Sequence, residues 1–398
     1  MSKFIQRTVH RLRYAAAVVH PVRRVPYDPS AYPPGVNLIG YLTSQMGLGQ
    51  GARLYARALE AGHVPHVLLD TTVASPSRHG DVEFAGRLAE RPVYGTNLVH
   101  VNAEQLPRLA AALPAATWNR RFTIGVWLWE LAEFPREWTG AFRHVDEIWT
   151  PSHFTTHAIA RVSPVPVVTV PYGIVAETDP ALDRAAFGLP EDAFLFLTLY
   201  DVRSYVERKN PYGAIDAFEK AFGTQRTDVL LVVKALNAGP AELNRLQHRI
   251  GAARNIRVLS AMLEKRAVHS LIRACDALVS LHRSEGFGLV LAEAMSLGVP
   301  VVATGWSANT DFMDEGNSCP VSSHLVDTGG AYVPLRQRQQ WAEPDLSHAA
   351  AQMRRLVLEP TYRKRIASAG QDTIRLRFSP SVSAAKMSAR LHELGLLP

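Results

Sequence analysis

HRSEGFGLVLAEAMSLGVPVVATG, residues 282–305, carries the strongest structural signal in this chain. The apolar run 276–281 that leads into it predicts a buried strand. A short turn with two glycines follows, then a helical pattern over 289–297 and a second apolar strand over 299–303. A strand, a glycine turn and a helix together present backbone N–H groups and a positive helix end to a phosphate. The carboxylate of Glu285 in the turn suits sugar hydroxyls instead, because it accepts hydrogen bonds.

The spacing of Glu285 and Glu293, followed by Gly298 and an apolar strand, resembles the E-x7-E signature of the family 4 retaining glycosyltransferases. The resemblance implies that Glu285 holds hydroxyls of a donor sugar and that Glu293 holds the nucleotide ribose. Further donor-site candidates lie between them: Gly286, Phe287, Gly288 and Leu289. The resemblance also implies a GT-B fold, which is an α/β architecture of two facing Rossmann-like domains with a cleft between them.

Length and composition fit this expectation. A chain of 398 residues is long for one core and suits two domains. We expect an extension and linker over 1–34, an acceptor-side domain over 35–172, a nucleotide-sugar-binding domain over 173–380, and a terminal helix over 381–398 that returns to the first domain. Two cysteines make no disulfide framework, and there is no apolar segment of roughly 20 residues and no secretory leader. We therefore expect a cytoplasmic enzyme.

The first 25 residues contain six Lys and Arg and no acid, with scattered apolar side chains. Two interpretations stay open for them: a basic amphipathic helix on an anionic membrane, or a solvated or packed extension. The net charge of +7 favours anionic partners, either phosphates or a membrane surface. We expect no nucleic-acid partner.

The first domain begins with a strand, a helix and a second strand, and its glycine loop includes Gly47 and Gly49. With Asp70 ending the second strand, this arrangement also fits a dinucleotide-binding fingerprint, so a Rossmann oxidoreductase is a rival interpretation. Four residues separate the first strand from Gly47, however, whereas the fingerprint turns at once. The resemblance implies instead that Gly47 and Gly49 face the donor pyrophosphate and the acceptor.

Glu130 follows a predicted strand over 122–128 and stands beside two tryptophans. Ligands bind at the carboxyl ends of parallel strands, so Glu130 is a candidate for orienting the acceptor hydroxyl. A plain surface glutamate is the alternative.

The second domain opens with a strand over 194–199 and a helix over 212–222, with basic residues between them. The resemblance implies an Arg and a Lys on the donor diphosphate. Lys209 matches the lysine, but Ser204 stands at the arginine position, so Arg203 or Arg208 must substitute. Lys234, at the end of the next predicted strand, and Met262 are further candidates for nucleotide binding. The stretch WAEP, residues 341–344, has no assigned chemistry, and we expect it to dock the last helices.

No carboxylate pair follows a strand and no Cys/His cluster has ligand spacing, so we expect no metal. The combined hypothesis is retaining, metal-independent transfer of a sugar to a hydroxyl of a glycan or lipid-linked acceptor. The co-substrate is a nucleoside diphosphate sugar, and no other cofactor is expected. The ERKNP stretch, residues 207–211, resembles a bacterial subgroup of polysaccharide and lipopolysaccharide transferases, and this resemblance favours GDP over UDP and dTDP. The alternative from another class is a non-catalytic nucleotide-sugar-binding subunit.

Overall fold

The computed structural model of the chain describes residues 24–73, 80–329 and 338–398. By its internal contacts the chain divides into two compact units. Of the described residues, the first unit contains those from 24 to 173 and from 378 to 398, and the second contains 174–329 and 338–377. The basic segment 1–25 lies outside the described residues except for its last two positions.

The first unit is built on one parallel sheet of six strands in the order β2-β1-β3-β4-β5-β6. Its strands are β1 (Val36–Gly40), β2 (His66–Asp70), β3 (Thr96–His100), β4 (Phe122–Val126), β5 (Glu147–Thr150) and β6 (Val167–Thr169). Its α-helices are α2 (Gly47–Ala61), α3 (Leu106–Ala112), α4 (His153–Ala160) and α12 (Pro380–Glu393). Three 3-10 turns complete it: η1 (Ala85–Arg87), η2 (Ala115–Thr117) and η3 (Arg136–His144).

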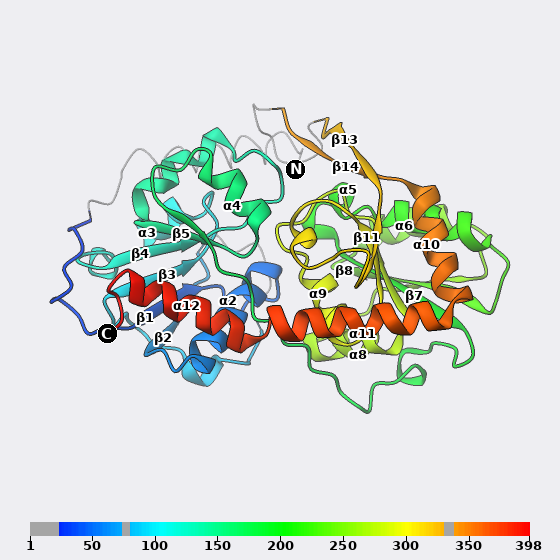
Figure 1. Cartoon of the computed structure of the whole chain (residues 1–398), viewed down its shortest axis with the longest axis horizontal. Helices are drawn as coiled ribbons and strands as arrows, with labels where there is room; N and C mark the ends of the chain where they lie inside the picture. The colour runs from blue at the N-terminus through cyan, green and yellow to red at the C-terminus, as the bar shows by residue number, and fades with distance from the viewer. Residues whose placement is uncertain (1–23, 74–79, 330–337) are drawn as a thin grey trace. The chain divides into compact units, whose positions relative to one another are not determined.

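Helix α12 lies beside α2 in this unit (Figure 1). Its buried anchor is Glu147 of β5, whose exposed fraction is 1%. The Arg390 guanidinium donates to both carboxylate oxygens, over 3.0 and 2.6 Å. Trp149 Nε1 donates to the same carboxylate over 2.7 Å. The last helix is therefore bound to the first unit by a paired, hydrogen-bonded buried charge.

The start of α2 differs from the sequence-based expectation. The helix begins at Gly47, so the glycines form its first turns instead of the loop expected from the sequence. A Cβ at Gly49 would collide with backbone carbonyl oxygens, and one at Gly51 would come within 2.5 Å of the Tyr172 hydroxyl. Gly49 and Gly51 thus allow close packing of the helix. The sequence suggested a loop instead, because glycine is common in turns.

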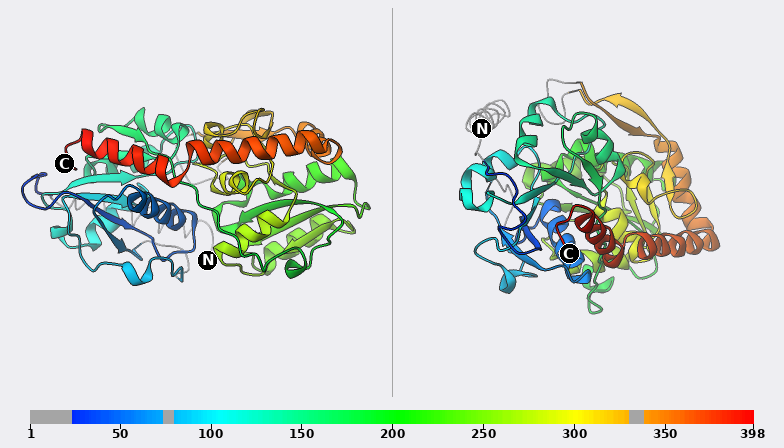
Figure 2. Two further views of the ribbon diagram at one scale, coloured as in Figure 1. Left: turned by 60° about the horizontal axis from the view of Figure 1, so that its bottom comes forward. Right: turned by 60° about the vertical axis from the view of Figure 1, so that its left-hand side comes forward.

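The second unit has its own parallel six-stranded sheet, in the order β12-β11-β10-β7-β8-β9, with helices on both sides (Figure 2). Its strands are β7 (Phe194–Asp201), β8 (Val229–Leu236), β9 (Ile256–Leu259), β10 (Ala277–Ser280), β11 (Val301–Thr304) and β12 (Cys319–Val321). Its α-helices are α5 (Val206–Lys209), α6 (Pro211–Phe222), α7 (Pro240–Ile250), α8 (Lys265–Ala274), α9 (Leu289–Ser296), α10 (Leu346–Leu358) and α11 (Pro360–Arg377). The 3-10 turns are η4 (Ala185–Phe187), η5 (Val202–Ser204) and η6 (Ala308–Asp311).

A separate antiparallel pair, β13 (Ser323–Asp327) and β14 (Gln340–Pro344), follows the second sheet. The WAEP stretch forms most of β14, so it pairs with β13. Two parallel sheets with crossover helices confirm the α/β class predicted from the sequence. In the described part of the chain, no helix combines the length and the apolar character that crossing a membrane requires.

Candidate functional site

Glu285 and two basic residues meet at the carboxyl edge of the second sheet. Glu285 stands in the turn after β10, and its exposed fraction is 8%. Lys209 Nζ donates to its Oε1 over 2.5 Å, and Arg208 Nη1 lies 3.3 Å from its Oε2. The structure thus joins residues that are 76 positions apart in the sequence.

The charges around Glu285 determine its protonation. Burial alone would raise the pKa of the carboxyl, but Lys209 and Arg208 outweigh it and lower the pKa to about 2. Glu285 is therefore a carboxylate at neutral pH. Two cations against one carboxylate leave a positive balance, which suits a phosphate, while the carboxylate oxygens suit hydroxyl donors.

The turn that carries Glu285 is held by a buried network of hydrogen bonds. Glu285 N donates to Ser307 Oγ over 2.9 Å, and Ser307 Oγ donates to Asn309 Oδ1 over 3.4 Å. Asn309 Nδ2 donates to Thr304 O, so its Oδ1 accepts from His282 Nε2 over 3.1 Å. Burial lowers the pKa of His282, consistent with a neutral ring protonated on Nε2. The four groups after β10 and β11 form one connected unit.

The glycine turn itself begins α9. Gly288 has φ +94°, a conformation that L side chains rarely adopt, and Leu289 starts the helix. Gly286 is buried and Leu289 is half-buried. Phe287, a predicted donor-site residue, is 2% exposed and packs on Phe312 with ring centroids 5.4 Å apart. Its side chain therefore packs in the protein interior and supports the turn.

Glu293 lies on α9 and pairs with α8. Its exposed fraction is 2%; Lys265 Nζ is 2.6 Å from Oε1, and His269 Nε2 is 3.6 Å from Oε2. Burial would raise the pKa of Glu293, but these two neighbours lower it to about 2. The structure places this ionised carboxylate against α8, with Lys265 as its partly exposed counter-ion.

The other predicted residues of the second unit occupy different environments. Lys234 is fully buried and donates to the carbonyl oxygens of Leu259, over 3.4 Å, and Ala261. Burial lowers its pKa, and its visible role is to support the turn after β9. Met262, on that turn, is 54% exposed. Arg203 is exposed on η5, so Arg208 is the arginine that accompanies Lys209.

Asp70 in the first unit does not have the environment of a dinucleotide-binding acid. Its two oxygens accept from Thr43 N over 3.0 Å and from Thr43 Oγ1 over 2.7 Å. The carboxylate therefore holds the segment that precedes α2. Gly47 and Gly49 lie in the first turn of that helix. A ribose would have to displace these bonds, which counts against the oxidoreductase interpretation.

Two glutamates in the first unit follow neighbouring strands at the same offset. Glu130 is half-buried, four residues beyond β4, and Glu104 is four residues beyond β3. Burial, with the nearby charge of Glu130, raises the pKa of Glu104 to about 7. Glu104 Oε2 is buried and has no hydrogen-bond partner within the described ranges. Sequence reasoning missed Glu104, although its position after a parallel strand was a signal of the same kind.

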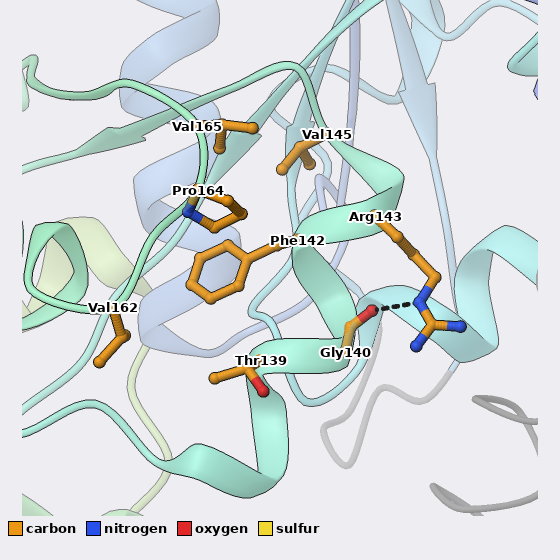
Figure 3. Close-up of a pocket in the computed structure, with 8 residues that line it drawn as sticks. All are labelled: Thr139, Gly140, Phe142, Arg143, Val145, Val162, Pro164 and Val165. Atoms are coloured by element: carbon orange, nitrogen blue, oxygen red, sulfur yellow. Dashed lines mark hydrogen bonds between the residues drawn. The ribbon is translucent and has the colours of Figure 1, made fainter.

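A pocket of about 600 Å³ lies elsewhere in the first unit (Figure 3). Its wall is mainly apolar, and Arg143 Nε donates to Gly140 O at its edge over 2.9 Å. None of the predicted site residues is among those that line it: Thr139, Gly140, Phe142, Arg143, Val145, Val162, Pro164 and Val165. Within residues 24–73, 80–329 and 338–398, no group of three or more His, Cys, Asp or Glu is placed to hold a metal ion.

Residues 182–320, which contain the Glu285 cluster, match the family model described as "Glycosyl transferases group 1". The D-inositol 3-phosphate glycosyltransferase of Stackebrandtia nassauensis is 30% identical over 173 residues, which are 40% of this chain and 38% of that protein. The protein of the same name from Xylanimonas cellulosilytica is 31% identical over 142 residues, 35% of this chain and 33% of that protein. The chain thus spans less than two fifths of the length of these curated relatives.

Solved structures match over most of the chain. HepE of Anabaena, in complex with UDP and glucose, has a TM-score of 0.63 at 16% identity, covering 90% of this chain and 100% of that one. Sucrose-phosphate synthase of Thermosynechococcus elongatus has a TM-score of 0.65 at 14% identity, covering 91% and 99%. At such identities the likeness concerns the fold, and it confirms the GT-B type predicted from the sequence.

Proposed function

We propose, from the match of residues 182–320 to the group 1 glycosyltransferase family, that the chain transfers a sugar from a nucleoside diphosphate donor to a hydroxyl acceptor with retention of configuration. The observation that carries the proposal is the buried carboxylate of Glu285 between Lys209 and Arg208. This cluster combines acceptors for sugar hydroxyls with cations for a diphosphate.

In this proposal each group of the cluster has its own task. Lys209 and Arg208 bind the donor diphosphate and stabilise the negative charge that develops as it leaves. A well-placed donor of this kind contributes roughly 3–4 kcal/mol to the transition state. Backbone N–H groups at the start of α9 add to the positive potential. Glu285 accepts hydrogen bonds from donor sugar hydroxyls and so orients the anomeric carbon, while Glu293 holds the ribose.

The nucleotide is the finer part of the proposal. Resemblance to a bacterial subgroup favours a GDP-linked donor, whereas the Anabaena protein with the same fold was solved with UDP and glucose. Both bases, and dTDP, therefore belong in the test. We propose that the turn after β9 lies at the base, with Lys234 holding the turn from inside and Met262 facing the base.

The acceptor is proposed to be a glycan or a lipid-linked hydroxyl, oriented by Glu130. Glu104 adds support, because a second carboxyl with a pKa near 7 stands close enough to Glu130 to interact with its charge. Replacing Glu130 by Gln is expected to depress transfer to the acceptor while donor affinity stays the same. Loss of donor affinity with normal acceptor kinetics would move Glu130 to the donor side.

The first experiment is a thermal-shift screen with UDP-, GDP- and dTDP-sugars, in which a ligand at 100 times its Kd stabilises by about 2.7 kcal/mol. For the base that stabilises the protein most, Lys209→Ala is then expected to weaken binding of the nucleoside diphosphate by about tenfold or more. Binding of the nucleoside alone is expected to change hardly at all. The control is Lys220→Ala, which removes an exposed lysine on α6. Equal losses for diphosphate and nucleoside would contradict the phosphate role.

Turnover separates the enzyme from a non-catalytic binding subunit. Wild type is expected to hydrolyse or transfer the donor sugar, also in the presence of EDTA, and Glu285→Gln is expected to lose most of this activity. Donor binding without turnover by wild type would favour the binding subunit. Activity abolished by EDTA and restored by Mg²⁺ or Mn²⁺ would overturn the metal-independent mechanism.

A further inference from the structure

Arg283 connects the Glu285 turn to the helix that carries the two cations. It stands two residues before Glu285, and its backbone N donates to Arg208 O over 2.7 Å. Its Nη1 donates to Glu207 O over 2.5 Å. The backbone and the side chain of Arg283 thus each bind a carbonyl group of α5.

Helix α5 depends on such contacts for its position. It is a single turn, Val206–Lys209, between two non-glycine residues of positive φ, Tyr205 at 60° and Asn210 at 50°. One helical turn is not stable by itself, and its last carbonyl groups have no partner within the helix. The two carbonyls that Arg283 engages belong to this set. A contact that fixes Arg283 therefore also fixes the frame of Arg208 and Lys209.

The opposite side of the Arg283 guanidinium is held by β14. Arg283 Nε and Nη2 donate to the two oxygens of Glu343 over 2.6 and 2.9 Å. Ala342 N donates to Arg283 O over 3.0 Å, and the guanidinium lies over the Trp341 ring, 5.5 Å from its centroid. The WAEP stretch thus binds one arginine through a carboxylate, a backbone N–H and an aromatic ring.

We propose that Glu343, acting through Arg283, is a positioning residue for the binding of the donor diphosphate by Arg208 and Lys209. The inference rests on the proposed function of that cluster. A bidentate arginine–carboxylate pair sets direction as well as distance. Without the carboxylate, the guanidinium loses the contacts that aim its third nitrogen at α5, and the two cations lose their common frame.

The test compares Glu343→Gln with Glu219→Gln. Glu219 accepts from Arg249 in the same two-pronged manner, over 3.2 and 2.9 Å, at similar partial exposure in the same unit but away from α5. Calorimetry with UDP and GDP, and with uridine and guanosine, gives the Kd values. We expect Glu343→Gln to weaken binding of the nucleoside diphosphates by roughly tenfold, because small displacements of binding groups have effects of this size. Binding of the nucleosides is expected to stay the same. The control is expected to match wild type.

Arg283→Lys is the second variant, because it keeps the charge and removes the fork. It is expected to lose diphosphate affinity as Glu343→Gln does, and it keeps the test open where Glu343→Gln fails to fold. A diphosphate Kd within twofold of wild type for the folded variants overturns the inference, as does an equal loss for the nucleoside. A wild type that binds neither UDP nor GDP overturns the proposed function and this inference with it.

Discussion

Ser307 holds a backbone conformation that is nearly restricted to glycine, with φ 74° and ψ −152°. Such a conformation costs roughly 1–3 kcal/mol and persists where the surroundings require it. Here the requirement is visible, since Ser307 Oγ accepts the backbone N–H of Glu285 and continues to Asn309. A strained residue whose side-chain hydrogen bonds lead to the candidate site has a positioning role.

Two substitutions at Ser307 separate strain from hydrogen bonding. Ser307→Ala keeps the strain and loses the acceptor, whereas Ser307→Gly loses the acceptor and relieves the strain. After the entropy cost of glycine, we expect the Gly variant to be about 1 kcal/mol more stable than the Ala variant in urea unfolding. Both are expected to have a lower kcat. A less stable Gly variant, or full activity in either, would contradict the assignment.

Glu293 gives a pH-dependent prediction. Its pKa is lowered to about 2 from 4.5, so the unfolded chain takes up the proton first as pH falls. Its stabilisation is therefore complete above about pH 4.5 and is lost between 4.5 and 2. We expect Glu293→Gln to be less stable than wild type at pH 7, by up to about 3 kcal/mol, with the difference shrinking below pH 4.5. Urea unfolding from pH 7 to 3 measures this, and a constant difference would refute it.

At this scale the sequence was informative where a motif names its residues. Glu285 and Lys209 were predicted by resemblance, and the structure brings them together. The residues that were missed act through geometry that no spacing reveals. His282 is an ordinary residue type, and its contact with Asn309 exists because the fold places β10 beside β11.

At the scale of elements, buried strands were predictable because apolar runs mark them. Helix α9 follows its predicted range 289–297 within one residue, and β10 lies inside its predicted run 276–281. The prediction of a glycine loop at the start of α2 was wrong, because glycines that permit close packing in a helix look the same in sequence as glycines of a loop. Helix α5 and the pair β13–β14 carry too few apolar residues for a periodic signal, and tertiary contacts such as those of Arg283 define them.

Helix α12 provides a prediction at this scale. Arg390→Met retains much of the apolar stem but leaves the buried carboxylate of Glu147 without its counter-ion. Breaking a buried pair in this way costs about 3–5 kcal/mol. The matched control is Glu393→Gln, which removes the exposed partner of the same arginine and is expected to change little. Urea unfolding with a probe of the first unit decides, and two equal effects would mean that the buried pair contributes nothing special.

At the scale of the whole molecule, each unit repeats one solution, a parallel six-stranded sheet with crossover helices. Length suggested two domains, and the resemblance to the family 4 glycosyltransferases implied a Rossmann-like architecture for each. The route by which the chain returns to the first unit at Phe378 was expected from resemblance alone, because no local pattern in α12 names its partner. The basic N-terminal segment is the part of the chain whose role still depends on composition.

That segment gives the last prediction. Residues 1–23 carry five Lys and Arg and no acid, and each is worth about 1 kcal/mol near an anionic membrane. The cut belongs after residue 23, because Arg24 pairs with Asp146 through two bonds of 3.0 Å and Val25 N donates to Asn119 Oδ1. Deleting 1–23 is expected to reduce binding to phosphatidylserine vesicles by tenfold or more, with no change on phosphatidylcholine.

Turnover on a soluble acceptor is expected to survive this deletion, because the contacts of Arg24 and Val25 with the first unit remain. Deleting 1–25 is the matched comparison: it removes those contacts as well and is expected to lower the stability of the first unit without further loss of vesicle binding. Unchanged vesicle binding after the shorter deletion would favour a solvated extension. A shorter deletion that fails to fold would show that residues 1–23 pack against the protein, and the membrane hypothesis would be abandoned.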